Sequence, residues 1–214
     1  MLVKKGLGME KEGLKITFLM DYFKFTAGQE IFFNKNDITV LFGDQGAGKT
    51  TLIKSFSSKE SLKKYNNKYI LVDNFPFKNC LYAESESFRR RDGGFILSRL
   101  DTEKIILNDM SHGQAWRRFI DTIKKREYQD SLVIFDEPET SLSVESTLEF
   151  CRLINYLKKE LRLTVIIATH NPVIIEFLAD RIIEVPSCED VDKTTLLSSI
   201  KEKVDLFRSE FVKN

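Results

Sequence analysis

One run of eight residues, Gly43-Asp44-Gln45-Gly46-Ala47-Gly48-Lys49-Thr50, has the residue types and spacing of a phosphate-binding loop. It fits the pattern G-x-x-x-x-G-K-S/T at every fixed position. Glycines let the backbone turn tightly and direct successive N–H groups at phosphate oxygens. We expect Lys49 to neutralise the β- and γ-phosphates and the Thr50 hydroxyl to ligate Mg²⁺. The predicted site for a nucleoside triphosphate therefore runs from Gly43 to Thr51.

The segments on either side of this loop support the interpretation. Ile38 to Phe42 is an apolar, β-branched run that predicts a buried strand, and Thr50 to Phe56 predicts the helix that follows it. A helix that begins at the loop adds partial positive charge where the phosphates would bind. The alternative is a glycine turn beside a chance lysine, and the strand–loop–helix order argues against it.

Two carboxylates end a second buried strand. Leu132 to Asp136 reads as four apolar residues followed by an acid, and Glu137 comes next. In phosphate-loop ATPases such a strand supports the metal, so we expect Asp136 to hold the Mg²⁺ shell. Glu137 is then the predicted general base that polarises the attacking water. The alternative, if no phosphate loop were present, is a strand that ends in a solvated acidic turn.

Two more segments carry polar groups at predicted element ends. Ser111-His112-Gly113-Gln114 precedes an amphipathic stretch from Ala115 to Lys125, where Ser111 is a suitable N-cap. Thr164 to Ala168 predicts a buried strand, and His170 follows it, where it can hydrogen-bond a γ-phosphate or orient water. The alternatives are an ordinary capped helix and a structural histidine.

The composition is that of a globular protein. The chain has 214 residues, 42% hydrophobic and 30% charged, with a formal net charge of +1. No apolar run is long enough to span a bilayer, and the three cysteines lack metal-ligand spacing. We therefore expect a reduced cytoplasmic protein without direct membrane insertion. We expect one α/β domain over residues 1–214, with an insert at roughly 75–128.

Taken together, these segments resemble the ATP-binding-cassette class of P-loop ATPases. Gly43 to Thr51 matches its Walker A loop and Leu132 to Glu137 its Walker B strand. Three further matches are the signature sequence, the D-loop and the switch histidine, at Ser111-His112-Gly113-Gln114, Ser141-Leu142-Ser143 and His170. The resemblance implies ATP and Mg²⁺ as cofactors and ATP hydrolysis as the activity. It also implies a mixed sheet flanked by helices, with antiparallel strands near the N-terminus and a small helical insert.

Within this class, the chain looks like the RecF-like and overcoming-lysogenisation-defect ATPases. The residues that carry this are Asp136-Glu137-Pro138-Glu139, Ala168-Thr169-His170-Asn171-Pro172 and the histidine at the second signature position. Those proteins act on DNA or in defence against phage. The 61 residues between Lys49 and Ser111 leave no room for a long coiled-coil arm, and the 44 residues after His170 leave none for a nuclease domain.

Two positions depart from the class. The chain has no glutamine between Lys49 and Gln114, so the usual Q-loop residue is absent, and Glu84 is the candidate substitute as a metal or water ligand. Ser143 stands where the D-loop often has aspartate. Both departures predict slow or partner-dependent turnover.

The resemblance implies a homodimer that closes around ATP, with Ser111, His112, Gly113 and Gln114 of one subunit completing the other subunit's site. The effector would be a separate nuclease-like or toxin-like chain. Arg89-Arg90-Arg91 is the candidate DNA contact, and the alternative is a solvated charged face, which is what most such runs are. Tyr22, Phe23 and Phe25 are candidates for stacking on adenine. The competing functions are the ATPase subunit of a membrane transporter and a nucleotide-binding scaffold that scarcely hydrolyses.

The last segment, Thr194 to Val212, places seven apolar residues at roughly helical spacing. We expect this helix to pack on the core, and a partner interface is the alternative.

Overall fold

The computed structural model of the chain describes residues 12–84, except 58, 67 and 74, and residues 121–211, except 122 and 125. Several predictions fall outside this range. They are the signature residues Ser111, His112, Gly113 and Gln114, the arginine run 89–91, and most of the helix expected at 115–125.

A five-stranded parallel sheet forms the centre of the described fold, in the order β5-β6-β7-β3-β8. Its strands are β3 (Ile38–Phe42), β5 (Cys80–Glu84), β6 (Leu132–Asp136), β7 (Thr164–Ala168) and β8 (Arg181–Glu184). All five residues of β6 and of β7 are buried. Strands covered on both faces need apolar residues at every position, which is why these runs show no alternation.

A separate three-stranded antiparallel sheet has the order β2-β1-β4. Its strands are β1 (Gly13–Phe18), β2 (Glu30–Asn34) and β4 (Ile70–Asp73). Alternate residues of β1 and β2 are buried, as expected for a sheet with one face in contact with water. The predicted N-terminal antiparallel strands are thus confirmed. The single mixed sheet that we expected is instead two sheets, one parallel and one antiparallel.

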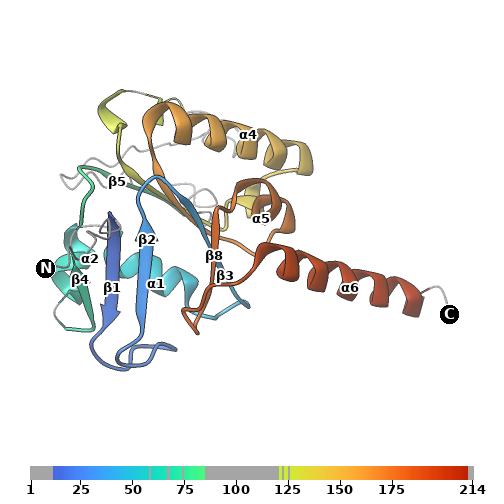
Figure 1. Cartoon of the computed structure of the whole chain (residues 1–214), viewed down its shortest axis with the longest axis horizontal. Helices are drawn as coiled ribbons and strands as arrows, with labels where there is room; N and C mark the ends of the chain where they lie inside the picture. The colour runs from blue at the N-terminus through green and yellow to red at the C-terminus, as the bar shows by residue number, and fades with distance from the viewer. Residues whose placement is uncertain are drawn as a thin grey trace, which may run out of the picture.

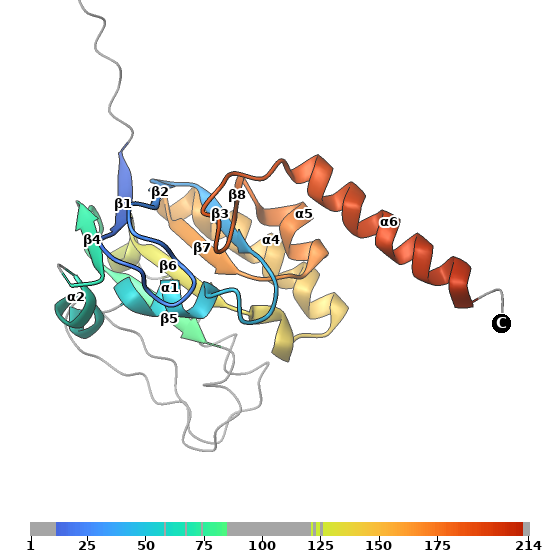
Figure 2. The ribbon, with the colours of Figure 1, turned by 90° about the horizontal axis from the view of Figure 1, so that it is seen from below.

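The helices cover the parallel sheet on both faces (Figure 1 and Figure 2). They are α1 (Lys49–Phe56), α2 (Lys59–Tyr65), α4 (Val144–Leu161), α5 (Pro172–Leu178) and α6 (Lys193–Phe211), with short 3-10 turns η2 (Arg126–Tyr128) and η3 (Pro138–Ser141). Buried residues of α4 and α5 share one core with alternate residues of the parallel sheet. Residues of α1 share a second core with the other face and with the antiparallel sheet. The helix that begins at the phosphate loop is therefore packed between two sheets.

Strand order decides which loops meet. Because all five strands run in parallel, the segments after β3, β5, β6 and β7 lie at one edge of the sheet. The carboxyl edge is where open α/β sheets bind ligands. The strand β5 lies inside the range 75–128 expected for the insert, yet it pairs with β6 over its full length. Residues 80–84 of that range therefore belong to the parallel sheet.

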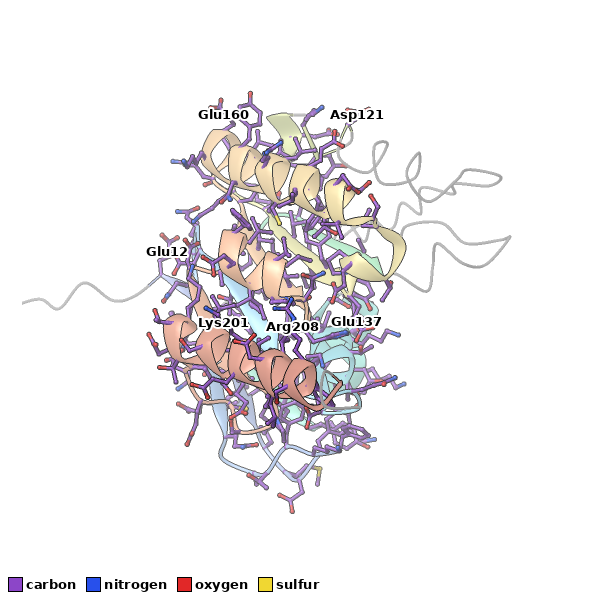
Figure 3. All side chains as sticks on the ribbon, turned by 90° about the vertical axis from the view of Figure 1, so that its right-hand side faces the viewer. Glu12, Asp121, Glu137, Glu160, Lys201 and Arg208 are labelled. Atoms are coloured by element: carbon purple, nitrogen blue, oxygen red, sulfur yellow. The ribbon has the colours of Figure 1, made fainter. Side chains whose placement is uncertain are left out.

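The prediction that the C-terminal helix packs on the core holds only for its first turns. Leu196 and Leu197 pack against the core that contains α4 and α5, whereas Val204, Leu206 and Phe207 are 46–61% exposed. The rest of α6 extends away from the other elements in both ribbon views, and its side chains are seen along its length in Figure 3. The apolar spacing of the sequence indicated a helix correctly, but burial required a neighbour that the described fold does not supply.

The three cysteines, Cys80, Cys151 and Cys188, are free, and burial raises the pKa of the Cys80 thiol to about 12. Such thiols are poor nucleophiles at neutral pH. Among the described helices, none is both long enough and apolar enough to cross a bilayer.

Two phenylalanines should respond very differently to truncation. Phe135 of β6 is fully buried and packs edge-on against Phe150 of α4, with ring centroids 5.1 Å apart. We expect Phe135→Ala to lower the free energy of unfolding by about 3–5 kcal/mol. Phe207→Ala on the exposed part of α6 should change it by less than about 0.5 kcal/mol, as surface substitutions usually do. Urea denaturation of both variants checks this, and equal losses would contradict the fold described here.

Candidate active site

The predicted phosphate loop adopts a conformation that depends on its glycines. Gly43, Gly46 and Gly48 all have positive φ, of 152°, 77° and 110°. A Cβ at Gly43 would lie 2.4 Å from the carbonyl oxygen of Val185, so a side chain has no space there. The loop therefore follows a backbone path that other residues resist. Asp44 and Gln45 are exposed at its tip, whereas Ala47 is buried.

Lys49 is buried within the loop, with 5% of its surface exposed. Its Nζ donates hydrogen bonds to the carbonyl oxygens of Gly43, at 2.6 Å, and Asp44, at 2.9 Å. A buried ammonium group needs such partners because leaving water is costly for a charge. The contacts hold the positive charge inside the curve of the loop, where a phosphate group would approach.

The beginning of α1 and the end of β6 meet at a hydrogen bond. Thr50 Oγ1 donates to Asp136 Oδ1 at 3.1 Å, and Tyr82 of β5 donates its hydroxyl proton to Asp136 Oδ2 at 3.3 Å. Asp136 is 4% exposed. A hydroxyl and a carboxylate fit Mg²⁺, which proteins usually bind through one or two carboxylates plus phosphate oxygens and water. No group of three or more His, Cys, Asp or Glu side chains in the described ranges forms a protein-only metal site.

Glu84, the candidate substitute for the absent Q-loop glutamine, ends β5. Its backbone is directly in register with that of Asp136 on the neighbouring strand. The two residues therefore share the carboxyl edge of the sheet, and the role of the Glu84 carboxylate stays a prediction.

Glu137, the predicted general base, has a left-handed backbone conformation, with φ 49° and ψ 55°. This conformation is uncommon for a residue with a side chain and costs free energy. It is held by the Glu137 amide, which donates to the Ala168 carbonyl at 2.9 Å, and by Thr140, which donates to the Glu137 carbonyl. The half-buried Glu137 side chain thus leaves the end of β6 in a direction that an extended backbone would not give.

His170, the predicted switch histidine, follows β7 at the same edge. Asn171 caps α5 by accepting a hydrogen bond from the Val173 amide at 2.8 Å, so the chain turns sharply at this point. The His170 side chain is 63% exposed, and its Nδ1 lies 3.8 Å from Oε1 of Glu139. An exposed imidazole on a fixed backbone is accessible to a ligand.

The structure separates the three aromatic candidates for adenine stacking. Phe25 is buried and stacks on Phe18, with ring centroids 4.3 Å apart, and Tyr22 packs against Tyr65 and Tyr69. Phe23 is 65% exposed. A Cβ at Gly48 would lie 3.3 Å from its Cδ1, which places the Phe23 ring edge beside the phosphate loop. Phe23 is therefore the candidate whose ring faces are available to a nucleotide.

Two residues at this edge were given no role from the sequence. Tyr82 contacts Asp136 from a neighbouring strand, and Glu139 contacts Thr169 and His170 across thirty residues of chain. For Tyr82 no local pattern signals the contact. Glu139 was named only within the run Asp136-Glu137-Pro138-Glu139 that carries the family resemblance, and its contacts were not predicted.

The comparisons with known proteins agree with the fold described above. Residues 59–176, more than half of the chain, match the family model described as "AAA domain, putative AbiEii toxin, Type IV TA system". The chain belongs to this AAA-domain family. Its fold is that of an ABC-type P-loop ATPase, a class whose cofactors are ATP and Mg²⁺. The family match covers β5, β6 and β7 but begins after the phosphate loop.

Curated relatives of this AAA domain are ATP-binding proteins of transporters. The chain is 30% identical over 154 residues to the zinc import ATP-binding protein ZnuC of Rickettsia conorii, and the match covers 64% of this chain and 66% of that protein. It is 26% identical over 191 residues to the bacitracin export ATP-binding protein BceA of Halalkalibacterium halodurans, covering 68% and 72%. The chain thus spans just under two thirds of the length of ZnuC.

Among solved structures, cbiO1 of Clostridium perfringens, part of the ABC transporter complex cbiONQ, superimposes with a TM-score of 0.53. The match covers 92% of this chain and 96% of cbiO1 at 18% identity. At this identity the likeness establishes the fold of the AAA domain.

Removing the Phe23 ring should weaken nucleotide binding without unfolding the protein. Aromatic stacking on a base contributes about 1–3 kcal/mol, so we expect Phe23→Ala to raise the Kd for ATP by about 5- to 150-fold. Phe177→Ala is the matched control, because Phe177 is similarly exposed, at 57%, on α5. Fluorescence titration with a labelled ATP analogue measures both variants, and an unchanged Kd in Phe23→Ala would exclude Phe23 as the stacking residue.

Proposed function

We propose that the chain binds ATP with Mg²⁺, hydrolyses it, and acts as an ATP-gated switch on a partner protein. The observation that carries the proposal is the 3.1 Å hydrogen bond between Thr50 and Asp136. It joins the phosphate loop to the acidic strand, and these two residues would hold Mg²⁺. When bound, Mg²⁺ would neutralise the charge that develops on the transferred phosphoryl group.

In this proposal each residue has one role. Lys49 and the loop amides hold the phosphates, Thr50 and Asp136 hold Mg²⁺, and Glu137 polarises the attacking water. His170 hydrogen-bonds the γ-phosphate, and Phe23 stacks on the base. The 63% exposure of His170 and the half-buried state of Glu137 support closure of the site by a second copy of the chain, with Ser111 to Gln114 supplied in trans.

The first candidate partner is a membrane subunit of a transporter. The relatives that favour it are named for zinc import and bacitracin export, and the chain is 26–30% identical to them. In that case ATP-driven closure of two copies of this domain would move the membrane subunits, as ligand-driven domain closure does in other proteins.

The second candidate is a separate effector in phage defence or DNA maintenance, as for RecF-like and overcoming-lysogenisation-defect ATPases. The family description, which names a toxin of a type IV TA system, favours it. So does the run Asp136-Glu137-Pro138-Glu139, on which the resemblance to these ATPases was based.

Replacing Glu137 tests the proposed function. Glu137→Gln keeps the shape of the side chain but removes the base, so we expect ATP binding to persist while turnover falls by at least about 100-fold. ATP should then hold the variant as a dimer in size-exclusion chromatography. Glu145→Gln, at an exposed position on α4, is the control and should behave as the wild type. Turnover at the wild-type rate in Glu137→Gln would refute the assignment.

The same variant identifies the partner. Tagged Glu137→Gln protein is recovered from its own cells with ATP and Mg²⁺, and the co-purifying chains are identified. An integral membrane permease favours the transporter candidate, whereas a nuclease-like or toxin-like chain favours the second.

A further inference from the structure

Glu139 links the turn that carries Glu137 to the turn that carries His170. It lies in η3, two residues after Glu137, and its side chain is only 9% exposed. Its Oε1 accepts a hydrogen bond from the Thr169 hydroxyl at 2.6 Å and a longer one from the His170 amide at 3.4 Å. A single carboxylate oxygen therefore links the turn after β6 to the turn after β7.

A series of hydrogen bonds fixes the backbone on both sides of His170. Before it, the Thr169 amide donates to the Leu41 carbonyl of β3 at 3.2 Å. After it, the Asn171 amide donates to Thr169 Oγ1 at 2.9 Å, and Asn171 caps α5. The His170 ring, by contrast, is 63% exposed. The backbone of His170 is thus held by neighbours, while the imidazole itself can respond to a ligand.

The second oxygen of Glu139 is unpaired. Oε2 is buried and has no hydrogen-bond partner within the described ranges, 12–84 and 121–211. An unsatisfied buried carboxylate oxygen costs free energy, and such atoms in native proteins call for an explanation. His170 Nδ1 lies 3.8 Å from the other oxygen of the same carboxylate, Oε1, just beyond hydrogen-bonding distance. A small rotation of the imidazole would bring Nδ1 within hydrogen-bonding distance of the carboxylate.

We propose that Glu139 is the positioning residue of His170, and that its carboxylate accepts a hydrogen bond from Nδ1–H when nucleotide is bound. With a proton on each ring nitrogen, Nε2–H is then left to donate to the γ-phosphate. Glu139 follows Glu137 in the same turn, in which Thr140 donates to the Glu137 carbonyl. The contact therefore transmits the presence of a γ-phosphate at His170 to the residue proposed as the general base. This inference rests on the proposed ATPase function.

Kinetics of single and double variants separate positioning from mere structural support. We expect Glu139→Ala to lower kcat by about 10- to 100-fold, by analogy with the loss when the orienting partner of a metal-binding histidine is removed. The KM for ATP should be unchanged, and Glu139→Gln, which keeps an acceptor oxygen, should lose less. Because Glu139 acts through His170, the double variant with His170→Ala should be no slower than His170→Ala alone. Effects that multiply, or an unchanged kcat in Glu139→Ala, would overturn the proposal.

A spectroscopic measurement tests the contact without relying on turnover. The chain has only two histidines, His112 and His170, so imidazole ¹⁵N signals are assigned with a His112→Ala variant. With a non-hydrolysable ATP analogue and Mg²⁺, we expect the wild type to show a proton on Nδ1 of His170 and Glu139→Ala to lose that signal. Identical His170 signals in wild type, Glu139→Gln and Glu139→Ala would contradict the proposal.

The two tests also separate this inference from the proposed function. A wild-type protein without ATP turnover would refute the proposed function, and the imidazole signals would then still decide whether Glu139 holds His170. Should Glu139→Ala fail to fold, Glu139→Gln, which preserves the volume and one acceptor, carries both measurements. Circular dichroism establishes that each variant is folded.

Discussion

The hydrogen bond between Thr50 and Asp136 is the contact on which the rest of the site depends. It joins residues 86 positions apart, at the start of α1 and the end of β6, although β7 lies between β6 and the strand that enters the loop. The contact requires α1 to cross the sheet towards β6, and α1 does so because its apolar face is packed between the two sheets. Packing within one hydrophobic core thus sets the geometry of a polar site.

Two of the non-glycine residues with positive φ and one of the unsatisfied buried atoms in the described ranges belong to this site. Glu137 and Phe23 have positive φ, and Glu139 has a buried oxygen without a hydrogen-bond partner among the described residues. Each costs free energy that ordinary turns avoid. Glu137 and Phe23 are proposed to act on the bound nucleotide, and Glu139 is proposed to position His170, which also contacts it. Stability is lowered locally where side chains must be presented to a ligand, while the fully buried strands β6 and β7 stabilise the sheet that carries them.

The sequence predicted the elements that carry local patterns. The bounds of β3, β6 and β7 follow from apolar runs, and the loop from its glycines and Lys49. What it could not predict depends on contacts between distant residues. The partner of β5, the contact of Tyr82 with Asp136 and the link from Glu139 to Thr169 arise from strand order. The exposure of the C-terminal part of α6 could not be predicted, because helical periodicity indicates an apolar face but not whether another element covers it.

The central claim is that Thr50 and Asp136 together complete a divalent-cation site for ATP. Manganese can stand in for Mg²⁺ and is observed by electron paramagnetic resonance, so a Mn²⁺ titration in the presence of ATP tests the claim directly. The wild type should bind one Mn²⁺ per ATP, and Asp136→Asn should still bind ATP but hold Mn²⁺ at least about 10-fold more weakly. Equal Mn²⁺ affinity in the two proteins would contradict the account.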